Sequence, residues 1–270
     1  MGGRGSSSSL RSGTATMGGA PNGPAPVFNP VQNSVANQAP DASNTPVVPG
    51  AVTALTNMSD DQLAALYRAS RSADMPNHLN DVADKTQRFV FQAGVNELPT
   101  VLDDAAFNQF MQDNNMTTRD ILSRSTGGAN YTVNGVTVRL TPQQVTDLMK
   151  TGIYNYVGGK HGGQLYGAGT YFAKTGGRPT GYGSNGATAL AVLNPKTARA
   201  IDRSTLISKA TTWARSHPKF AAAVGSPSDR SNYSIYALAM GYNVITDHAT
   251  SPDYHNVIDR SALVYRKSNY

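Results

Sequence analysis

The chain has 270 residues, no cysteine, 15% charged residues and a formal net charge of +6. The lack of cysteine excludes disulfides and thiolate nucleophiles, and it favours a cytosolic setting over a small secreted fold. The sequence contains no run of about 18 apolar residues and no signal-peptide core, so we expect neither a membrane span nor a membrane partner. The modest excess of Lys and Arg favours an anionic ligand only weakly, because a basic solvated surface explains it equally well.

The first 57 residues are predicted to form a flexible arm rich in Gly, Ser and Pro. Residues 1–50 contain eight Gly, seven Pro and seven Ser, and too few apolar side chains to offset the entropy of ordering the segment. The alternative is an arm that becomes ordered in an assembly by lying across neighbouring molecules. The rest of the chain divides into a helical lead-in, 58–100, and a core, 101–270.

From Ser59 onward, capping residues and apolar periodicity predict a series of helices and strands. Ser59 caps one helix, Thr141 caps another, and Asn134-Gly135 is typical of a type I′ hairpin turn. Two helices are predicted to begin at Ser59 and Thr141, and three more to span 103–114, 204–216 and 231–240. The predicted strands are 121–124, 170–173, 187–193, 242–246, 255–259 and 262–266, together with a hairpin at 131–140. Helices come early and strands late without regular βαβ units, so we expect an α+β fold with a mostly antiparallel sheet.

Several familiar catalytic signatures are absent from the sequence. It has no phosphate-binding GxxxxGK[ST], no GxGxxG between a strand and a helix, and no GxSxG nucleophile elbow. The five histidines show no HExxH motif and no paired-ligand spacing, so we expect no metal site. Sixteen of the seventeen acidic residues are Asp, and a mechanism that needs a glutamate has only Glu97 to use.

The segment 167–183 carries the strongest chemical signal. Tyr171 and Tyr182 stand eleven residues apart among glycines, one in a predicted strand and one in a predicted turn. Two aromatic faces beside backbone that can approach closely suit the sandwiching of a flat heteroaromatic ring. The alternative is that Tyr171 is a core strand residue and that the glycines only form loops.

The run Leu165–Ala173, followed by Tyr182-Gly183, resembles the GxGxYFA…YG stretch of the ADP-ribosyltransferase superfamily, including its poly(ADP-ribose) polymerase branch. The resemblance implies that Tyr171 and Tyr182 face each other across the nicotinamide of NAD, which is the substrate. It also places Arg124 where the family has an Arg or His that contacts the ribose and phosphate of NAD.

This resemblance covers roughly residues 90–267 and is greatest for domains found in bacteriophage head and virion proteins. It implies a split, mostly antiparallel sheet of the ADP-ribosyltransferase type, preceded by helices and a low-complexity arm. It also implies that Ser125, Gly169 and Thr170 lie beside the dinucleotide.

The sequence departs from the family where the family has a catalytic Glu on a late strand. The corresponding place falls at Tyr254, with Asp253 one residue before it. In the family the carboxylate fixes the ribose and stabilises oxocarbenium character as the bond to nicotinamide breaks. Neighbouring strand side chains point to opposite faces, so Asp253 helps only if a bulge turns it inward. A second departure is Pro179, which stands where the polymerase branch has a serine that binds the carboxamide.

The leading interpretation is an NAD-dependent ADP-ribosyltransferase that modifies a protein, in the cytoplasm or a virion, with Arg124, Tyr171 and Asp253 or Tyr254 as catalytic residues. The alternative is a virion structural or cargo protein that keeps the fold without the reaction and contacts capsid or connector proteins through residues 1–50. A nucleic-acid-binding module fits less well, because Lys and Arg form no run and no RRM, KH or HTH signature occurs.

Overall fold

The structure is a computed structural model, and it describes residues 51–72, 85–94, 98–133, 136–151, 169–174, 186–249 and 253–269. Within these ranges the fold is α+β with a mostly antiparallel, open sheet, as the sequence predicts. Four parts of the chain considered above lie outside the described residues: the predicted arm up to residue 50, Glu97, the turn at Asn134-Gly135, and the segment with Pro179 and Tyr182.

Eight strands form the main sheet in the order β1-β10-β6-β2-β5-β9-β8-β7. The strands are β1 (Thr100–Leu102), β2 (Leu122–Thr126), β5 (Thr170–Lys174), β6 (Ala187–Leu193), β7 (Ala200–Asp202), β8 (Val244–Asp247), β9 (Tyr254–Val257) and β10 (Leu263–Arg266). Pairing is parallel only at the two edges, between β1 and β10 and between β7 and β8. The central strands β6, β2, β5 and β9 are all antiparallel, and β2 and β5 carry Arg124, Ser125, Thr170 and Tyr171, four of the residues predicted to bind NAD.

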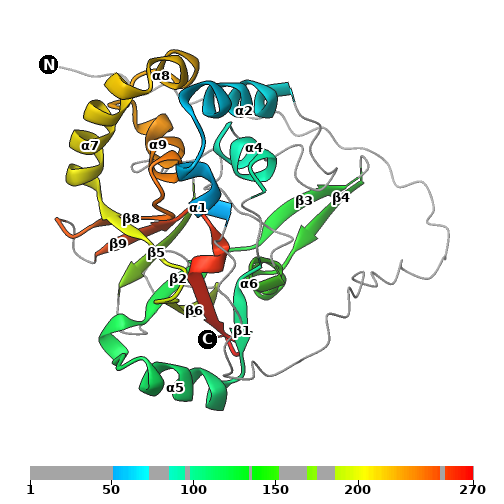
Figure 1. Cartoon of the computed structure of the whole chain (residues 1–270). Helices are drawn as coiled ribbons and strands as arrows, with labels where there is room; N and C mark the ends of the chain where they lie inside the picture. The colour runs from blue at the N-terminus through cyan, green and yellow to red at the C-terminus, as the bar shows by residue number, and fades with distance from the viewer. Residues whose placement is uncertain are drawn as a thin grey trace, which may run out of the picture. The chain divides into compact units, whose positions relative to one another are not determined.

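One face of the β9–β8–β7 region is covered by helices, which Figure 1 shows gathered on that side of the sheet. They are α1 (Ala51–Thr56), α2 (Asp60–Ser72), α4 (Lys85–Gln92), α7 (Arg203–Ser216), α8 (Pro218–Val224) and α9 (Tyr233–Ala239). Their apolar side chains form a core with Ile245 of β8, and Tyr171 and Tyr254 pack against its edge. We call this side of the sheet the helix-covered face. Ser59 begins α2 through a capping box, in which its hydroxyl accepts from Gln62 N and the Gln62 side chain accepts from Ser59 N.

The opposite face carries a second core. Leu122, Phe172, Val257 and Tyr265 are fully or almost fully buried there, together with alanines of β6. Because side chains alternate along a strand, Phe172 and Tyr171 point to opposite faces. A third cluster joins helix α5 (Asp104–Asp113) to strands β6 and β10, on the side of β6 opposite the second core. The Asp103 side chain caps α5 by accepting from Ala106 N at 2.8 Å.

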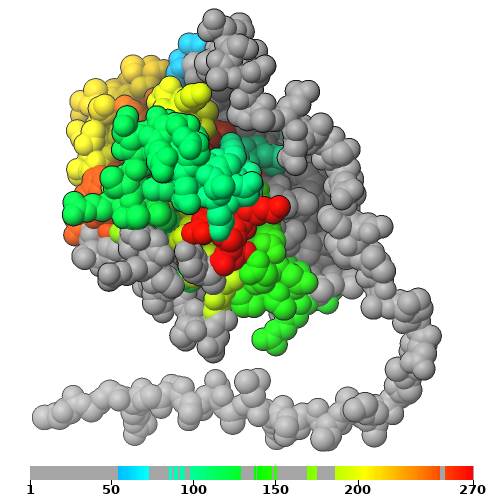
Figure 2. Space-filling view, turned by 90° about the horizontal axis from the view of Figure 1, so that it is seen from below, coloured from blue at the N-terminus to red at the C-terminus, as the bar shows by residue number. Residues whose placement is uncertain are grey.

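The C-terminal residues lie between α5 and α6 (Pro142–Thr151), where Figure 2 shows them in red. Arg266 pairs with Asp104 at 2.5 Å, and this pairing holds the pKa of Asp104 well below its usual value. The ammonium of Lys150, on α6, donates to Lys267 O at 2.7 Å and to the Asn269 side chain. Burial lowers the pKa of Lys150 to about 8. These contacts fix the chain end against two helices without any apolar anchor among them.

Most predicted elements are confirmed within two residues of their expected bounds. They include the hairpin β3 (Ala129–Val133) and β4 (Val136–Leu140), which forms a separate two-stranded sheet. The sequence did not predict α1, α4, α8, β1 and β7, nor the 3-10 helices η1 (Thr118–Asp120), η2 (Arg230–Asn232) and η3 (Arg260–Ala262). Helix α1 falls within the 1–57 range assigned to the arm. Among the described residues, no helix has the length and apolarity needed to cross a membrane.

Candidate functional site

The sheet opens between β2 and β5, the two strands that carry the predicted NAD-binding residues. Strand β2 pairs with β6 along all five of its residues, but with β5 at only two positions, Leu122↔Lys174 and Ser123↔Ala173. Beyond Ser123 the described residues of β2 and β5 do not pair. Instead, Arg124 Nη1 donates to Tyr171 O at 2.8 Å, so a side chain takes the place of a ladder hydrogen bond. This opening is the candidate site.

Two faces of the sheet contribute to the opening. Ser125 and Tyr171 belong to the helix-covered face, where Ser125 Oγ lies 2.9 Å from Thr188 Oγ1 of β6. Arg124 starts from the opposite face, next to buried Tyr265, and reaches the Tyr171 main chain from there. Burial raises the pKa of the Tyr265 phenol, and the positive charges of Arg124 and Arg260 oppose that rise. Arg124, Ser125 and Tyr171 are each half-buried and therefore retain solvent contact.

Gly169 and Thr170 have packing roles in the structure. Thr170 is buried at the start of β5, and Gly169 lies against the side chain of Asn256. A Cβ at position 169 would come within 2.0 Å of Asn256 Oδ1 and 2.9 Å of Val257 O. The missing side chain of Gly169 thus leaves room for Asn256.

Replacing Gly169 with alanine is expected to cost about 1–3 kcal/mol of stability, because overpacking forces neighbouring groups to move. Asn256 can turn away, but the carbonyl of Val257 is backbone and can yield only if β9 shifts. Denaturant unfolding of the variant measures this loss. Gly127→Ala is the matched control, since a Cβ there meets nothing within 4 Å. Equal stability of the two variants would contradict the assigned role of Gly169.

Asp253 and Tyr254, the two residues considered for the position of the family's catalytic Glu, have different surroundings in the structure. Tyr254 pairs with Ala173 and packs on the helix-covered face, the face that also carries Tyr171. Asp253 precedes β9; its carbonyl accepts from Lys174 N at 2.8 Å, and its carboxylate lies 3.2 Å from His248 Nδ1. Asp253 is therefore engaged with a loop histidine rather than directed toward Tyr171.

The residue directly opposite Tyr171 is Asn256, which the sequence reasoning missed. The ladder pairs Tyr171 with Asn256 and pairs Asn256 with Ile245 of β8. Asn256 is fully buried, and its Nδ2 donates to Ser234 Oγ of α9 at 3.4 Å. Because side chains alternate along a strand, the sequence could have placed Asn256 on the same face as Tyr254. The strand register, which sets Asn256 opposite Tyr171, follows only from the three-dimensional pairing of β5 and β9. Neither β5 nor β9 contains an acidic residue.

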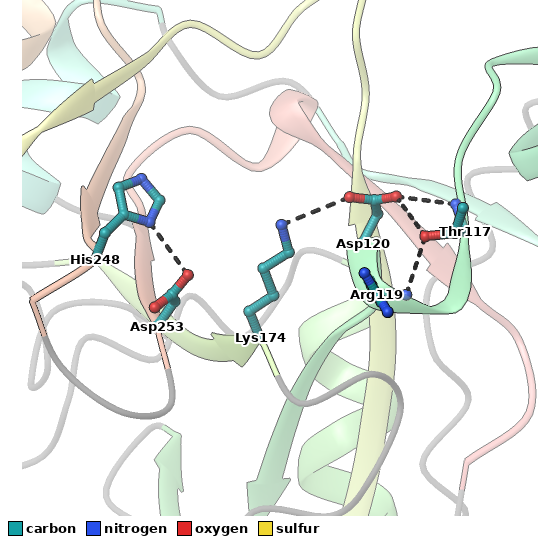
Figure 3. A network of polar contacts seen from close by, with 6 residues as sticks. All are labelled: Thr117, Arg119, Asp120, Lys174, His248 and Asp253. Carbon is teal, nitrogen blue, oxygen red and sulfur yellow. Dashed lines mark hydrogen bonds and ion pairs between the residues drawn. The ribbon is translucent and has the colours of Figure 1, made fainter.

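A charged group lies at the Lys174 end of β5 (Figure 3). Lys174 Nζ lies 3.5 Å from the Asp120 carboxylate, which also accepts a hydrogen bond from Thr117 N. His248 and Asp253 pair on the other side of Lys174. The ring centroid of buried His255 lies 6.1 Å from that of His248. Burial, together with the charges of Lys174 and His248, lowers the pKa of His255 to about 4.

The described residues contain no group of three or more His, Asp or Glu side chains arranged to hold a metal ion. Tyr182 lies outside the described residues, so its pairing with Tyr171 stays a prediction. Comparisons with protein-family models, with curated proteins and with solved structures find no match to this chain. The chemistry of the site must therefore be argued from the donors it contains: a guanidinium, a hydroxyl and a half-buried phenol.

Proposed function

We propose that this chain is an ADP-ribosyltransferase-like protein that binds NAD in the opening between β2 and β5. The observation that supports it most is Arg124, whose guanidinium lies within the opened ladder and contacts the strand of Tyr171. Arg124 Nη1 donates to the Tyr171 carbonyl, and a guanidinium at this place in the ladder is a group suited to binding a phosphate or ribose oxygen. Tyr171, with Tyr182, would stack on the nicotinamide.

The reaction we propose is the transfer of ADP-ribose to a protein nucleophile. The bond between the ribose and nicotinamide breaks, nicotinamide leaves with the bonding electrons, and the nucleophile bonds to the ribose carbon and loses a proton. The transition state carries positive charge on the ribose, so a carboxylate near it would speed the step. Asn256 supplies a neutral amide at the position opposite Tyr171.

This neutral position favours a second candidate, a protein that binds NAD without cleaving it. Asn256 is buried and hydrogen-bonded to α9, and Tyr254 contributes a phenol rather than a carboxylate to the same face. In this version the protein keeps the fold as a virion structural or cargo component and is tethered by residues 1–50. Deleting residues 1–50 tests the tether, and unimpaired incorporation into particles would count against it.

Incubating the full chain with NAD labelled in its adenylate half separates the two candidates. A transferase produces labelled protein and an equal amount of free nicotinamide, both separable by chromatography. A protein that only binds NAD retains the labelled dinucleotide on filtration and releases no nicotinamide. Arg124→Gln should abolish either signal, whereas Arg119→Gln, an equal charge change at exposed Arg119 of η1, should leave it unchanged. The proposal is overturned if the unaltered chain neither retains the labelled dinucleotide nor releases nicotinamide.

A further inference from the structure

A pocket separate from the β2–β5 opening lies among helices α1, α2, α7 and α9. Its volume is about 580 Å³, within the range of cavities that hold small organic molecules. The apolar part of its lining comes from three of these helices and the turns that follow them, and includes Leu55, Met58, Leu63, Ala239 and Met240. Leu55, Leu63 and Ala239 are almost fully buried behind the partly buried Met58 and Met240, so the two methionines present the apolar surface to a ligand.

Trp213 of α7 provides an aromatic wall of the pocket. Its indole stacks on His217 with the ring centroids 3.7 Å apart and the planes 8° from parallel. His217 Nδ1 lies 3.1 Å from Trp213 O, and the rings of Phe220 and Tyr236 meet the indole edge-on. The indole is thereby fixed on several sides by the protein, yet it lines the pocket. A fixed aromatic wall favours a flat aromatic ligand.

The charge in the pocket has one sign. Lys209 of α7 lines it, its ammonium 3.1 Å from the phenol oxygen of Tyr242, which lines it as well. None of the described residues that line the pocket is acidic. The carboxylate at the start of α2, Asp60, accepts from Lys219 N and Phe220 N and is thus directed at the start of α8. The hydroxyls of Thr212 and Ser216 also line the pocket, and they donate to the main-chain carbonyls of Ser208 and Trp213 within α7.

We propose that this pocket binds an aromatic organic anion, with the ring system against Trp213 and the apolar residues and the anionic group at Lys209 and Tyr242. Apolar lining alone would accept any hydrophobic molecule, but Lys209, with no carboxylate among the described lining residues, selects for negative charge. A charge-assisted hydrogen bond from Lys209 to the ligand is the selective contact. The described residues that line the pocket include none of those that form the β2–β5 opening.

Trp213 is the only tryptophan in the chain, so its fluorescence reports on this pocket directly. The probe is 8-anilinonaphthalene-1-sulfonate, an aromatic anion that accepts energy from an excited indole. The matched neutral probe is N-phenyl-1-naphthylamine, which lacks the sulfonate. Titrating the full chain should give saturable energy transfer from Trp213 at one anionic probe per chain, with weaker binding of the neutral probe.

Lys209→Met should weaken binding of the anionic probe about tenfold, in line with the loss of a charged hydrogen bond, and change the neutral probe less than about twofold. Lys196→Met is the matched control, because Lys196 is an exposed lysine outside the pocket lining, and it should change neither affinity. Thermal unfolding of each variant checks that the fold is kept. The proposal is overturned if Trp213 transfers no energy to the bound anion, or if Lys209→Met and Lys196→Met affect its affinity equally.

Discussion

Replacing Phe220 with alanine is expected to lower the free energy of unfolding by about 3–5 kcal/mol. Phe220 of α8 is fully buried at the centre of an aromatic cluster. Its ring centroid lies 5.5 Å from Trp213, 5.7 Å from Tyr236, 6.2 Å from Phe89 and 6.3 Å from Tyr67. The truncation removes buried area and opens a cavity among rings that belong to four different helices, so no single helix can move to fill it.

Denaturant unfolding followed by circular dichroism measures this loss, and the emission of Trp213 should shift to the red as its neighbour disappears. Leu98→Ala is the control, because Leu98 is 62% exposed and should change stability by less than about 0.5 kcal/mol. A Phe220→Ala variant within 1 kcal/mol of the unaltered chain would contradict the packing described for α8, which the sequence did not predict.

Acidification from pH 7 to pH 4 is expected to cost about 3 kcal/mol through His255 alone. The folded-state pKa of His255, about 4, is below the ordinary value of 6.5, so the folded protein binds fewer protons than the unfolded chain over this window. The stability is complete above pH 6.5, falls as the pH drops toward 4, and changes no further below that. Burial causes the shift, with Lys174 and His248 adding positive charge and Asp253 opposing them.

The slope of unfolding free energy against pH, compared between the unaltered chain and histidine variants, measures this effect. His255→Gln should flatten the slope between pH 6.5 and 4, since glutamine has no proton to gain. His248→Gln should retain most of the slope, because the His248 side chain is 57% exposed. An unchanged slope in His255→Gln would show that this histidine is not held neutral in the folded protein.

The sequence could predict the elements that carry local signals. Capping residues such as Asp103, Ser59 and Thr141 occupy their expected helix starts, and the apolar run 187–193 forms the buried strand β6. The short edge strands β1 and β7 could not be predicted, because three residues carry no period. Each is formed only by parallel pairing with a strand distant in sequence.

The candidate site was predictable in part. The motif order indicated Arg124 and Tyr171, and the structure brings them into contact across two adjacent strands. The residue opposite Tyr171 was not predictable, because register between segments 85 residues apart depends on tertiary pairing rather than local pattern. The sequence indicated Asp253 or Tyr254 as the residue near the nicotinamide, whereas the strand pairing places Asn256 opposite Tyr171. The packing role of Gly169 depends on this position of Asn256 and could not be predicted without it.

The most direct test of the proposed site is an equilibrium titration of the full chain with NAD, followed by calorimetry. We expect saturable binding of one NAD per chain, weakened at least about tenfold by Arg124→Gln and less than about twofold by Arg119→Gln. Salt should weaken the binding, because the fork of Arg124 is expected to contact an anionic phosphate. No saturable heat with NAD, or equal affinities of the two arginine variants, would contradict the assignment of the β2–β5 opening as a dinucleotide site.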